Sequence, residues 1–226
     1  MKILGLETSS DLEGVAILAD ERILVNCQLR VQTGHSQKLL SLIDLSLSQA
    51  GLGLREVDLL AVSLGPGSFT GLRIGLATAK GICLAQGVPL VGIPTLDGLA
   101  FGFPSTSHFI CPLLDARRGE VYAALYSREE GDLERKSPWL VVGIKELASH
   151  IGRKTIFLGE GARIYRKELR DILGEKALFA PDGWFEPSAA NIAWLAKERL
   201  KEEGGKGLDE VEPLYLMRPK VKPRKG

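Results

Sequence analysis

The chain has 226 residues, of which 45% are hydrophobic and 25% are charged, and its formal net charge is +1. This length and composition are typical of a soluble globular protein with one large domain or two small ones. The near-zero charge gives no overall electrostatic reason to expect nucleic-acid binding. The exception is the basic segment 218–226, which we interpret as a disordered tail and as the one place where direct RNA contact is allowed.

The cysteines and the N-terminal residues predict a cytoplasmic protein. Cys27, Cys83 and Cys111 are odd in number and lie in apolar runs, which favours reduced thiols over disulfides or a zinc site. Only a few apolar residues precede Glu7, so the N-terminus lacks the apolar core of a secretory signal. No apolar stretch of ~20 residues is present, so we expect no membrane association.

The first half begins with three predicted strands, at residues 2–8, 14–19 and 23–29. A predicted helix at 34–50 follows them and ends at Gly51. An acid at the end of the first strand is followed by hydroxyls, in the order Glu7, Thr8, Ser9. Actin-like ATPases and sugar kinases hold Mg²⁺ and phosphate with a similar order, although they place Asp where this chain has Glu7. A polar hairpin without a ligand is the alternative.

The segment 59–86 is the least ordinary part of the chain. An apolar strand, 59–64, leads into the turn Gly65-Pro66-Gly67 and then into a helix, 68–86, with Ser68 and Thr70 as candidate N-caps. Such a turn directs backbone N–H groups outward, as phosphate sites require. It lacks the Lys-Ser/Thr of a P-loop, and on spacing alone a turn without a ligand is favoured.

Helix 68–86 carries two apolar stripes. The first contains Leu72, Leu76, Ala79 and Cys83, and the second contains Ile74, Ala77, Gly81, Ile82 and Ala85. One stripe packs on the sheet, and the other needs a neighbour: helix 34–50, a second chain, or both. We expect Leu72 and Leu76 to face outward, so that Glu at either position leaves the fold intact and blocks association. Small residues at 75, 77, 79 and 81 permit close helix approach.

A strand at 89–93 and a helix at 95–101 complete the first half, and the pattern restarts after residue 107. The predicted elements of the second half are strands 108–114, 120–126, 139–142 and 155–158 and helices 144–151, 162–173 and 187–203. We therefore predict an α/β fold of two duplicated βββαβα subdomains, 1–103 and 104–217. The last helix is expected to pack back on the first subdomain.

Two turns in the second half are candidates for contact with a nucleotide held between the halves. Asp115 and Arg117 lie in a turn at a strand end, and Gly159, Glu160 and Gly161 join a strand to a helix. With Glu7, Thr8 and Ser9 they form the candidate nucleotide site. Ordinary β-turns without a ligand remain the alternative.

Six segments together resemble the TsaB (YeaZ) family, bacterial proteins that take part in making threonylcarbamoyladenosine in tRNA. They are ILGLETSS, HSQKLL, GPGSFTGLRIGLATAKGI, DARRGEVYAALY, LGEGA and PSAANIAWLA. The resemblance implies the actin/Hsp70/sugar-kinase (ASKHA) fold, in agreement with the duplicated pattern. It also implies a non-catalytic subunit that binds a TsaD-type threonylcarbamoyltransferase, with a TsaE-like ATPase in the complex and tRNA contacted only indirectly.

The resemblance also bears on catalysis. TsaD-type proteins carry two metal-binding histidines four residues apart, and the matching positions here hold Thr95 and Leu99. The histidines present, His35, His108 and His150, share no ligand spacing. We therefore expect no metal and no catalytic residue, and at most weak ATP or ADP binding, in the complex. The alternative is a stand-alone ATPase or a metallopeptidase-like hydrolase.

We expect the partner to bind through helices 34–50 and 68–86, and the isolated chain to form a homodimer through the same surface. The expected interface residues are His35, Leu39, Leu42, Leu45, Ser68, Phe69, Leu72, Arg73, Leu76, Ala79, Lys80 and Cys83.

Overall fold

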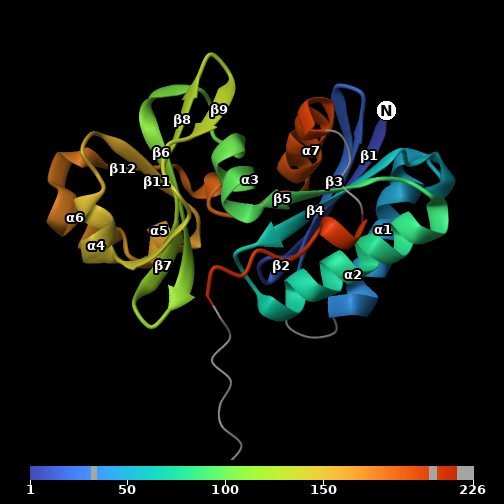
Figure 1. Ribbon diagram of the computed structural model, residues 1–226, viewed down its shortest axis with the longest axis horizontal. Coiled ribbons are helices and arrows are strands. Elements are labelled where there is room, and N and C mark those ends of the chain that lie inside the picture. The colour runs from blue at the N-terminus through green and yellow to red at the C-terminus, as the bar shows by residue number, and fades with distance from the viewer. Residues whose placement is uncertain (32–34, 204–207, 218–226) are drawn as a thin grey trace, which may run out of the picture.

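The computed structural model describes residues 1–31, 35–203 and 208–217; the side chains of 35–37 and 202–203, and the predicted tail 218–226, lie outside this description. Two β-sheets lie side by side, each with its own helices (Figure 1). Every described helix is too short or too polar to pass through a lipid bilayer.

The first sheet has the strand order β3-β2-β1-β4-β5. The first three strands form an antiparallel meander, and β4 and β5 run parallel to β1. The bounds are Lys2–Glu7 for β1, Leu12–Ala19 for β2, Arg22–Arg30 for β3, Leu59–Gly65 for β4 and Leu90–Pro94 for β5. The five predicted strands of this half are confirmed, with ends that differ by one or two residues.

Both faces of this sheet are covered, which explains why β1 and β4 are apolar throughout. Leu4, Leu6 and Val62 point into a core beneath α1 (His35–Ala50) and α2 (Phe69–Gln86). Ile3, Leu59 and Ala61 point to the opposite face, where α7 (Ala189–Glu203) packs. The missing side chain of Gly5 makes room for the Ala189 carbonyl there.

The second sheet has the strand order β10-β7-β6-β11-β12, which matches the order of the first sheet strand for strand. The bounds are Thr106–Arg117 for β6, Glu120–Ala123 for β7, Leu140–Gly143 for β10, Thr155–Leu158 for β11 and Ala177–Phe179 for β12. Helices α4 (Ile144–Ser149), α5 (Glu160–Ile164) and α6 (Arg166–Leu173) accompany it. The predicted α/β duplication is thus confirmed by topology.

Three details of the second half were predicted wrongly. Residues 120–126 are divided between two strands. The first, β7, ends at Ala123, and the second, β8 (Tyr126–Glu129), pairs with the beginning of β6. The hairpin of β8 with β9 (Asp132–Arg135) and the short strand β12 were missed. The single helix expected at 162–173 is two helices that meet at Tyr165.

Two further segments connect the halves to one another and to the first core. Helix α3 (Thr95–Gly102) lies between the sheets and contacts β6 and α7. The segment Leu208–Met217 begins with a 3₁₀ turn, buries Val211 in the core beneath α1 and α2, and hydrogen-bonds to β4 through Leu214 N and Leu64 O at 2.7 Å. It ends between the two halves (Figure 1).

Candidate functional site

The start of α2 is locked against the β1–β2 turn. Ser68 is the N-cap, since its side chain accepts a hydrogen bond from Gly71 N at 3.2 Å, whereas Thr70 lies inside the helix. Ser68 N also donates to Ser9 O at 2.6 Å. A Cβ at Gly71 would overlap the carbonyl oxygen of Thr8. The turn after β4 therefore binds the chain's own backbone.

The position of Gly75 corrects one expectation. A Cβ at Gly75 would overlap the Thr8 hydroxyl, so this glycine accommodates the β1–β2 turn rather than a partner helix. Gly81 differs, because nothing lies within 4 Å of a Cβ built there. Of the small residues in α2, Ala77 and Gly81 are exposed, and Ala79 is buried.

The candidate nucleotide residues at the end of β1 lie inside the protein. Glu7 and Thr8 are completely buried and Ser9 nearly so. Glu7 Oε1 accepts a hydrogen bond from Ser9 N at 2.6 Å, but burial raises the pKa of the Glu7 carboxyl above its usual value. Its Oε2 finds no hydrogen-bond partner among the described residues. Glu7 therefore does not present a carboxylate to a ligand between the halves.

The candidate residues of the second half lie beside an acidic cluster. Asp115 Oδ1 accepts hydrogen bonds from Arg117 N at 3.0 Å and from the Tyr165 hydroxyl at 3.3 Å. Loss of water raises the pKa of the Glu160 carboxyl, and repulsion from Asp115, Glu186 and Asp11 raises it further. Gly159 and Gly161 pack against Leu113 of β6. The structure thus brings Asp115 and Glu160 into one acidic cluster, whereas Glu7 is buried.

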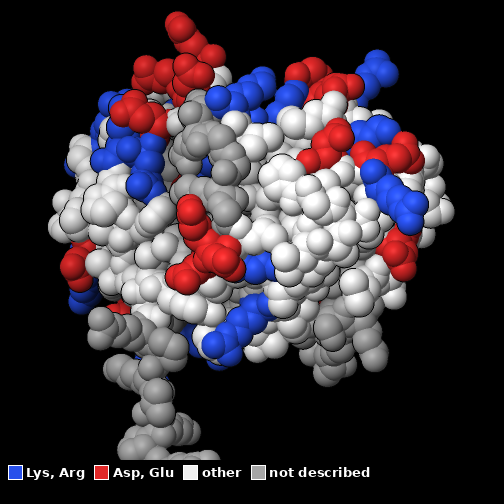
Figure 2. Space-filling model, turned by 45° about the vertical axis from the view of Figure 1, so that its right-hand side comes forward, with Lys and Arg blue, Asp and Glu red and all other residues white. Residues whose placement is uncertain are grey.

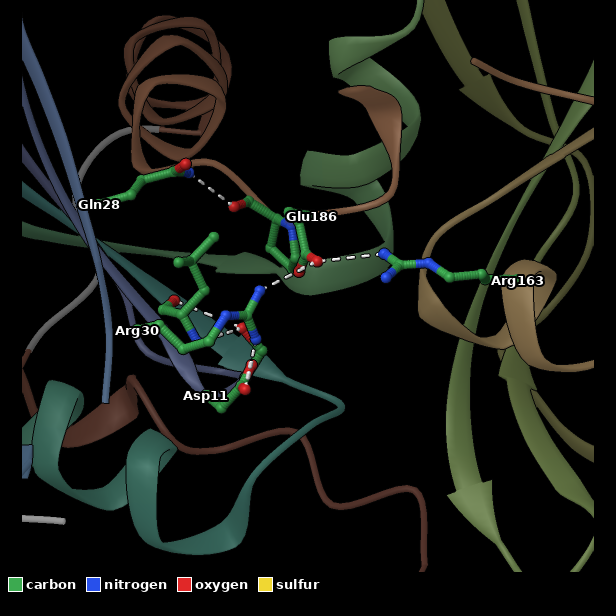
Figure 3. Close-up of polar contacts among 8 residues, drawn as sticks. Asp11, Gln28, Arg30, Arg163 and Glu186 are labelled. Atoms are coloured by element: carbon green, nitrogen blue, oxygen red, sulfur yellow. Dashed lines mark hydrogen bonds and ion pairs between the residues drawn. The ribbon is translucent and has the colours of Figure 1, made fainter. Parts of the chain in front are cut away.

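Ion pairs bridge the two halves beside this cluster (Figure 3). Glu186, in the segment that leads into α7, pairs with Arg30 of β3 at 3.5 Å and with Arg163 of α5 at 3.2 Å. Arg30 also pairs with Asp11. Gln28 donates to the carbonyl of Pro187 at 3.2 Å. Two arginines and several acids share this region, so it offers a polyphosphate little net positive charge.

The expected interface residues divide into two groups. Six of them are buried in the chain's own core: Leu39, Leu42, Leu72, Leu76, Ala79 and Cys83. The expectation that the Leu72 stripe faces outward is wrong, because α2 packs this stripe on the sheet. A Glu at Leu72 or Leu76 would place a charge in the core, so these substitutions are expected to disrupt the fold.

The remaining expected residues stay accessible or lie outside the description. Leu45, Phe69 and Arg73 are exposed, Ser68 and Lys80 are half-buried, and the side chain of His35 lies outside the described residues. Prediction missed Leu84, which is 74% exposed, and Leu40, which is 52% exposed.

The outward face of α2 consists of the second stripe seen in the sequence. Ala77, Gly81 and Ala85 are exposed, and Ile74 and Ile82 are half-buried. Figure 2 shows a broad uncharged area on the side of the molecule that carries α1 and α2, with charged groups mainly around its border. We call the exposed residues Leu40, Ala77, Gly81, Leu84 and Ala85 the helix face. Leu45 lines a hollow with Cys27 and Leu29 of β3.

Thr95 and Leu99, where the resemblance implies histidines in TsaD-type proteins, are both buried. Thr95 is fully buried and Leu99 is 3% exposed, and both belong to α3. Within the described ranges, no three side chains of His, Cys, Asp or Glu are grouped so that they could hold a metal ion.

Comparison with known proteins adds to this geometry. Residues 30–223 match the family described as TsaD: tRNA N6-adenosine threonylcarbamoyltransferase. The protein named tRNA threonylcarbamoyladenosine biosynthesis protein TsaB from Bacillus subtilis is 28% identical over 207 residues, which are 88% of each chain.

Solved structures agree in fold. A Pseudomonas aeruginosa crystal structure, described as an uncharacterized protein with similarity to peptidase YEAZ, has a TM-score of 0.82 at 25% identity, with 96% of this chain and 99% of that chain covered. The ROK hexokinase from Thermus thermophilus has a TM-score of 0.52 at 14% identity, covering 89% and 100% respectively, which supports the ASKHA fold. The chain belongs to the TsaD family, and the relatives that it resembles over most of its length are named TsaB or YeaZ.

Proposed function

We propose that this protein takes part in the synthesis of threonylcarbamoyladenosine in tRNA as a non-catalytic subunit that binds a TsaD-type threonylcarbamoyltransferase. The name of its Bacillus subtilis relative supports the pathway. The helix face is the observation that supports partner binding, because large exposed apolar side chains on two adjacent helices are costly to leave in water.

The residues of α3 support the non-catalytic role. A metal-dependent transferase of this family needs imidazole ligands where this chain has Thr95 and Leu99, and neither side chain can replace an imidazole. Buried Glu7 supports the same proposal, since a carboxylate without access to the surface cannot hold a hydrated Mg²⁺ ion. ATP or ADP binding is proposed to be weak and to occur in the complex, which also contains a TsaE-like ATPase.

The isolated chain is proposed to form a homodimer through the helix face. Exposed Gly81 and Ala77 let a second pair of helices approach closely, and two helices from each chain would form a four-helix bundle. The two assemblies then compete for one surface, so the TsaD-type partner should convert homodimers into heterodimers.

Co-purification with a TsaD-type protein tests the proposal. Leu84→Glu is expected to abolish binding and self-association while leaving the circular dichroism spectrum unchanged, because Leu84 is 74% exposed. Ile172→Glu is the matched control, since Ile172 lies on α6 and is 43% exposed. Normal binding by Leu84→Glu would place the interface elsewhere. Turnover of ATP or a peptide by the isolated wild-type chain would contradict the non-catalytic role.

A further inference from the structure

A cavity of about 630 Å³ lies between the two halves, apart from the ion pairs of Figure 3. Its walls come from three places: the start of α2, the turn between β6 and β7, and the segment that ends at Met217. Its aromatic and charged lining residues include Phe69, Arg117, Arg118, Glu120, Tyr122 and Tyr215. We call this cavity the aromatic groove.

One wall of the aromatic groove contains two exposed aromatic residues in contact. The Phe69 and Tyr215 ring centroids lie 5.4 Å apart, and the two residues are 42% and 41% exposed. The Arg73 guanidinium lies over the Phe69 ring, 4.1 Å from its centroid, and its Nε donates to the Tyr215 hydroxyl at 3.4 Å. Exposed aromatic residues beside a cation are suited to contact with nucleic-acid bases.

The turn between β6 and β7 contributes positive charge to the lining of the groove. Arg117 and Arg118 are exposed, and no described residue forms an ion pair with either guanidinium. Both have left-handed φ angles, 66° and 59°, which non-glycine residues adopt at a cost. Glu120 adds one negative charge to the same lining, but the two arginines outnumber it, so the net charge stays positive. Arginines in this setting suit phosphate groups.

The sequence extends this charge beyond the groove. Met217 lines the groove, and the residues that follow it in the sequence, 218–225, are rich in Lys and Arg. A ligand with an aromatic base and one phosphate needs the groove alone, whereas a strand with several phosphates is also complementary in charge to the sequence that follows Met217. The charge distribution therefore favours a polymer.

We propose that the aromatic groove binds a single-stranded segment of RNA, with a base stacked on Phe69 and Tyr215 and phosphates held by Arg117 and Arg118. The proposal rests on the proposed function, because tRNA is the macromolecular substrate of that pathway. It replaces the expectation that this chain meets tRNA only indirectly. The net charge of +1 does not oppose it, since the contact depends on local charge.

Fluorescence anisotropy with a labelled, unmodified tRNA transcript tests the proposal on the full chain. Arg118→Gln is expected to weaken binding and to lower the slope of log K against log salt by about 0.7, the value for one phosphate contact on a single strand. Tyr215→Ala is expected to weaken binding by about tenfold, while Tyr215→Phe keeps the ring and binds as the wild type does. Arg55→Gln removes an exposed arginine outside the groove and is the control.

Three results would overturn the proposal. One is an equal loss of tRNA affinity in Arg118→Gln and Arg55→Gln, which would indicate non-specific electrostatic attraction. Another is full displacement of the bound tRNA by AMP or ATP, which would indicate a site for a small nucleotide instead of a strand. The third is equally tight, Arg118-dependent binding of an acidic peptide.

Co-purification separates this proposal from the proposed function. Arg118→Gln and Tyr215→Ala lie outside the helix face and are expected to bind the TsaD-type protein normally. If the wild-type chain fails to bind that protein, the proposed function fails, whatever the RNA measurements give.

Discussion

The Tyr126 hydroxyl donates a 2.6 Å hydrogen bond to the carboxylate of Asp97, and this buried contact joins β8 of the second half to α3. Arg199 of α7 pairs with the other carboxylate oxygen. Burial, followed by the charge of Asp97, raises the pKa of the Tyr126 hydroxyl, so it stays a protonated donor. Three elements that are distant in the sequence thus meet at one carboxylate.

Removal of the Tyr126 hydroxyl should destabilise the folded protein. Tyr126→Phe is expected to lower the free energy of unfolding by about 1.5–3 kcal/mol, because Asp97 loses a buried hydrogen bond to a charged acceptor. Tyr165→Phe is the control: its 3.3 Å bond to Asp115 is longer and less buried, so its loss should be smaller. Urea unfolding measures the free energy of unfolding of both variants. Equal decreases would contradict the larger contribution expected from the buried bond to Asp97.

Two glycines of α2 should respond in opposite directions to the same substitution. Gly71→Ala is expected to destabilise the protein by about 1–3 kcal/mol, since its Cβ would meet the Thr8 carbonyl. Gly81→Ala has open space and is expected to stabilise α2 by up to about 1 kcal/mol through helix propensity. Thermal unfolding of the two variants provides the comparison, and a neutral Gly71→Ala would show that the turn yields easily.

The stability effect of Glu160 should depend on pH. Its pKa is raised in the folded state, so protonation of Glu160 favours folding. This contribution to the free energy of unfolding is complete below the usual value of 4.5 and is lost as the pH rises through the raised pKa. Glu160→Gln removes the repelled charge and should raise the Tm at pH 7, with a gain that shrinks towards pH 4.5. Glu175→Gln, on an exposed 3₁₀ turn, is the comparison substitution. A gain that is independent of pH would refute the electrostatic explanation.

The three thiols should differ in reactivity. Burial raises the pKa of Cys83 to about 11 from 9.0, which lowers its thiolate fraction at pH 8 by roughly 100-fold, and it raises that of Cys111 further. Cys27 is half-buried beside α1. Iodoacetamide followed by mass spectrometry should therefore label Cys27 first in the native protein and all three in denaturant. Fast native labelling of Cys111 would indicate local opening of the second core.

Sequence periodicity predicted the first half well because its strands are buried on both faces and its turns carry strong signals. Leu59 to Leu64 is uninterrupted apolar sequence, and Gly51 and Gly87 end helices in the left-handed conformation. The second half was harder to predict. The break between β7 and β8 lies inside an apolar run, and only its tertiary pairing with the long strand β6 shows it.

The candidate sites show where a pattern does not determine orientation. Both stripes of α2 were recognisable, but which stripe faces the sheet depends on contacts with Thr8 that periodicity does not contain. The order Glu7, Thr8, Ser9 resembles a ligand loop, yet all three residues are buried, and Gly71 and Gly75 of α2 lie against Thr8. The aromatic groove was not predicted, because its walls come from three segments that are distant in the sequence.

The position of α7 affects the order in which the protein matures on the ribosome. One face of the first sheet, with Ile3, Leu59 and Ala61, is covered by residues near Ile192 and Ala193. While the nascent chain is shorter than this, that face is open to water, although all five of its strands have been made. Folding of the first half is therefore completed after most of the chain has been synthesised, and the uncovered sheet is a surface for chaperones to protect during translation.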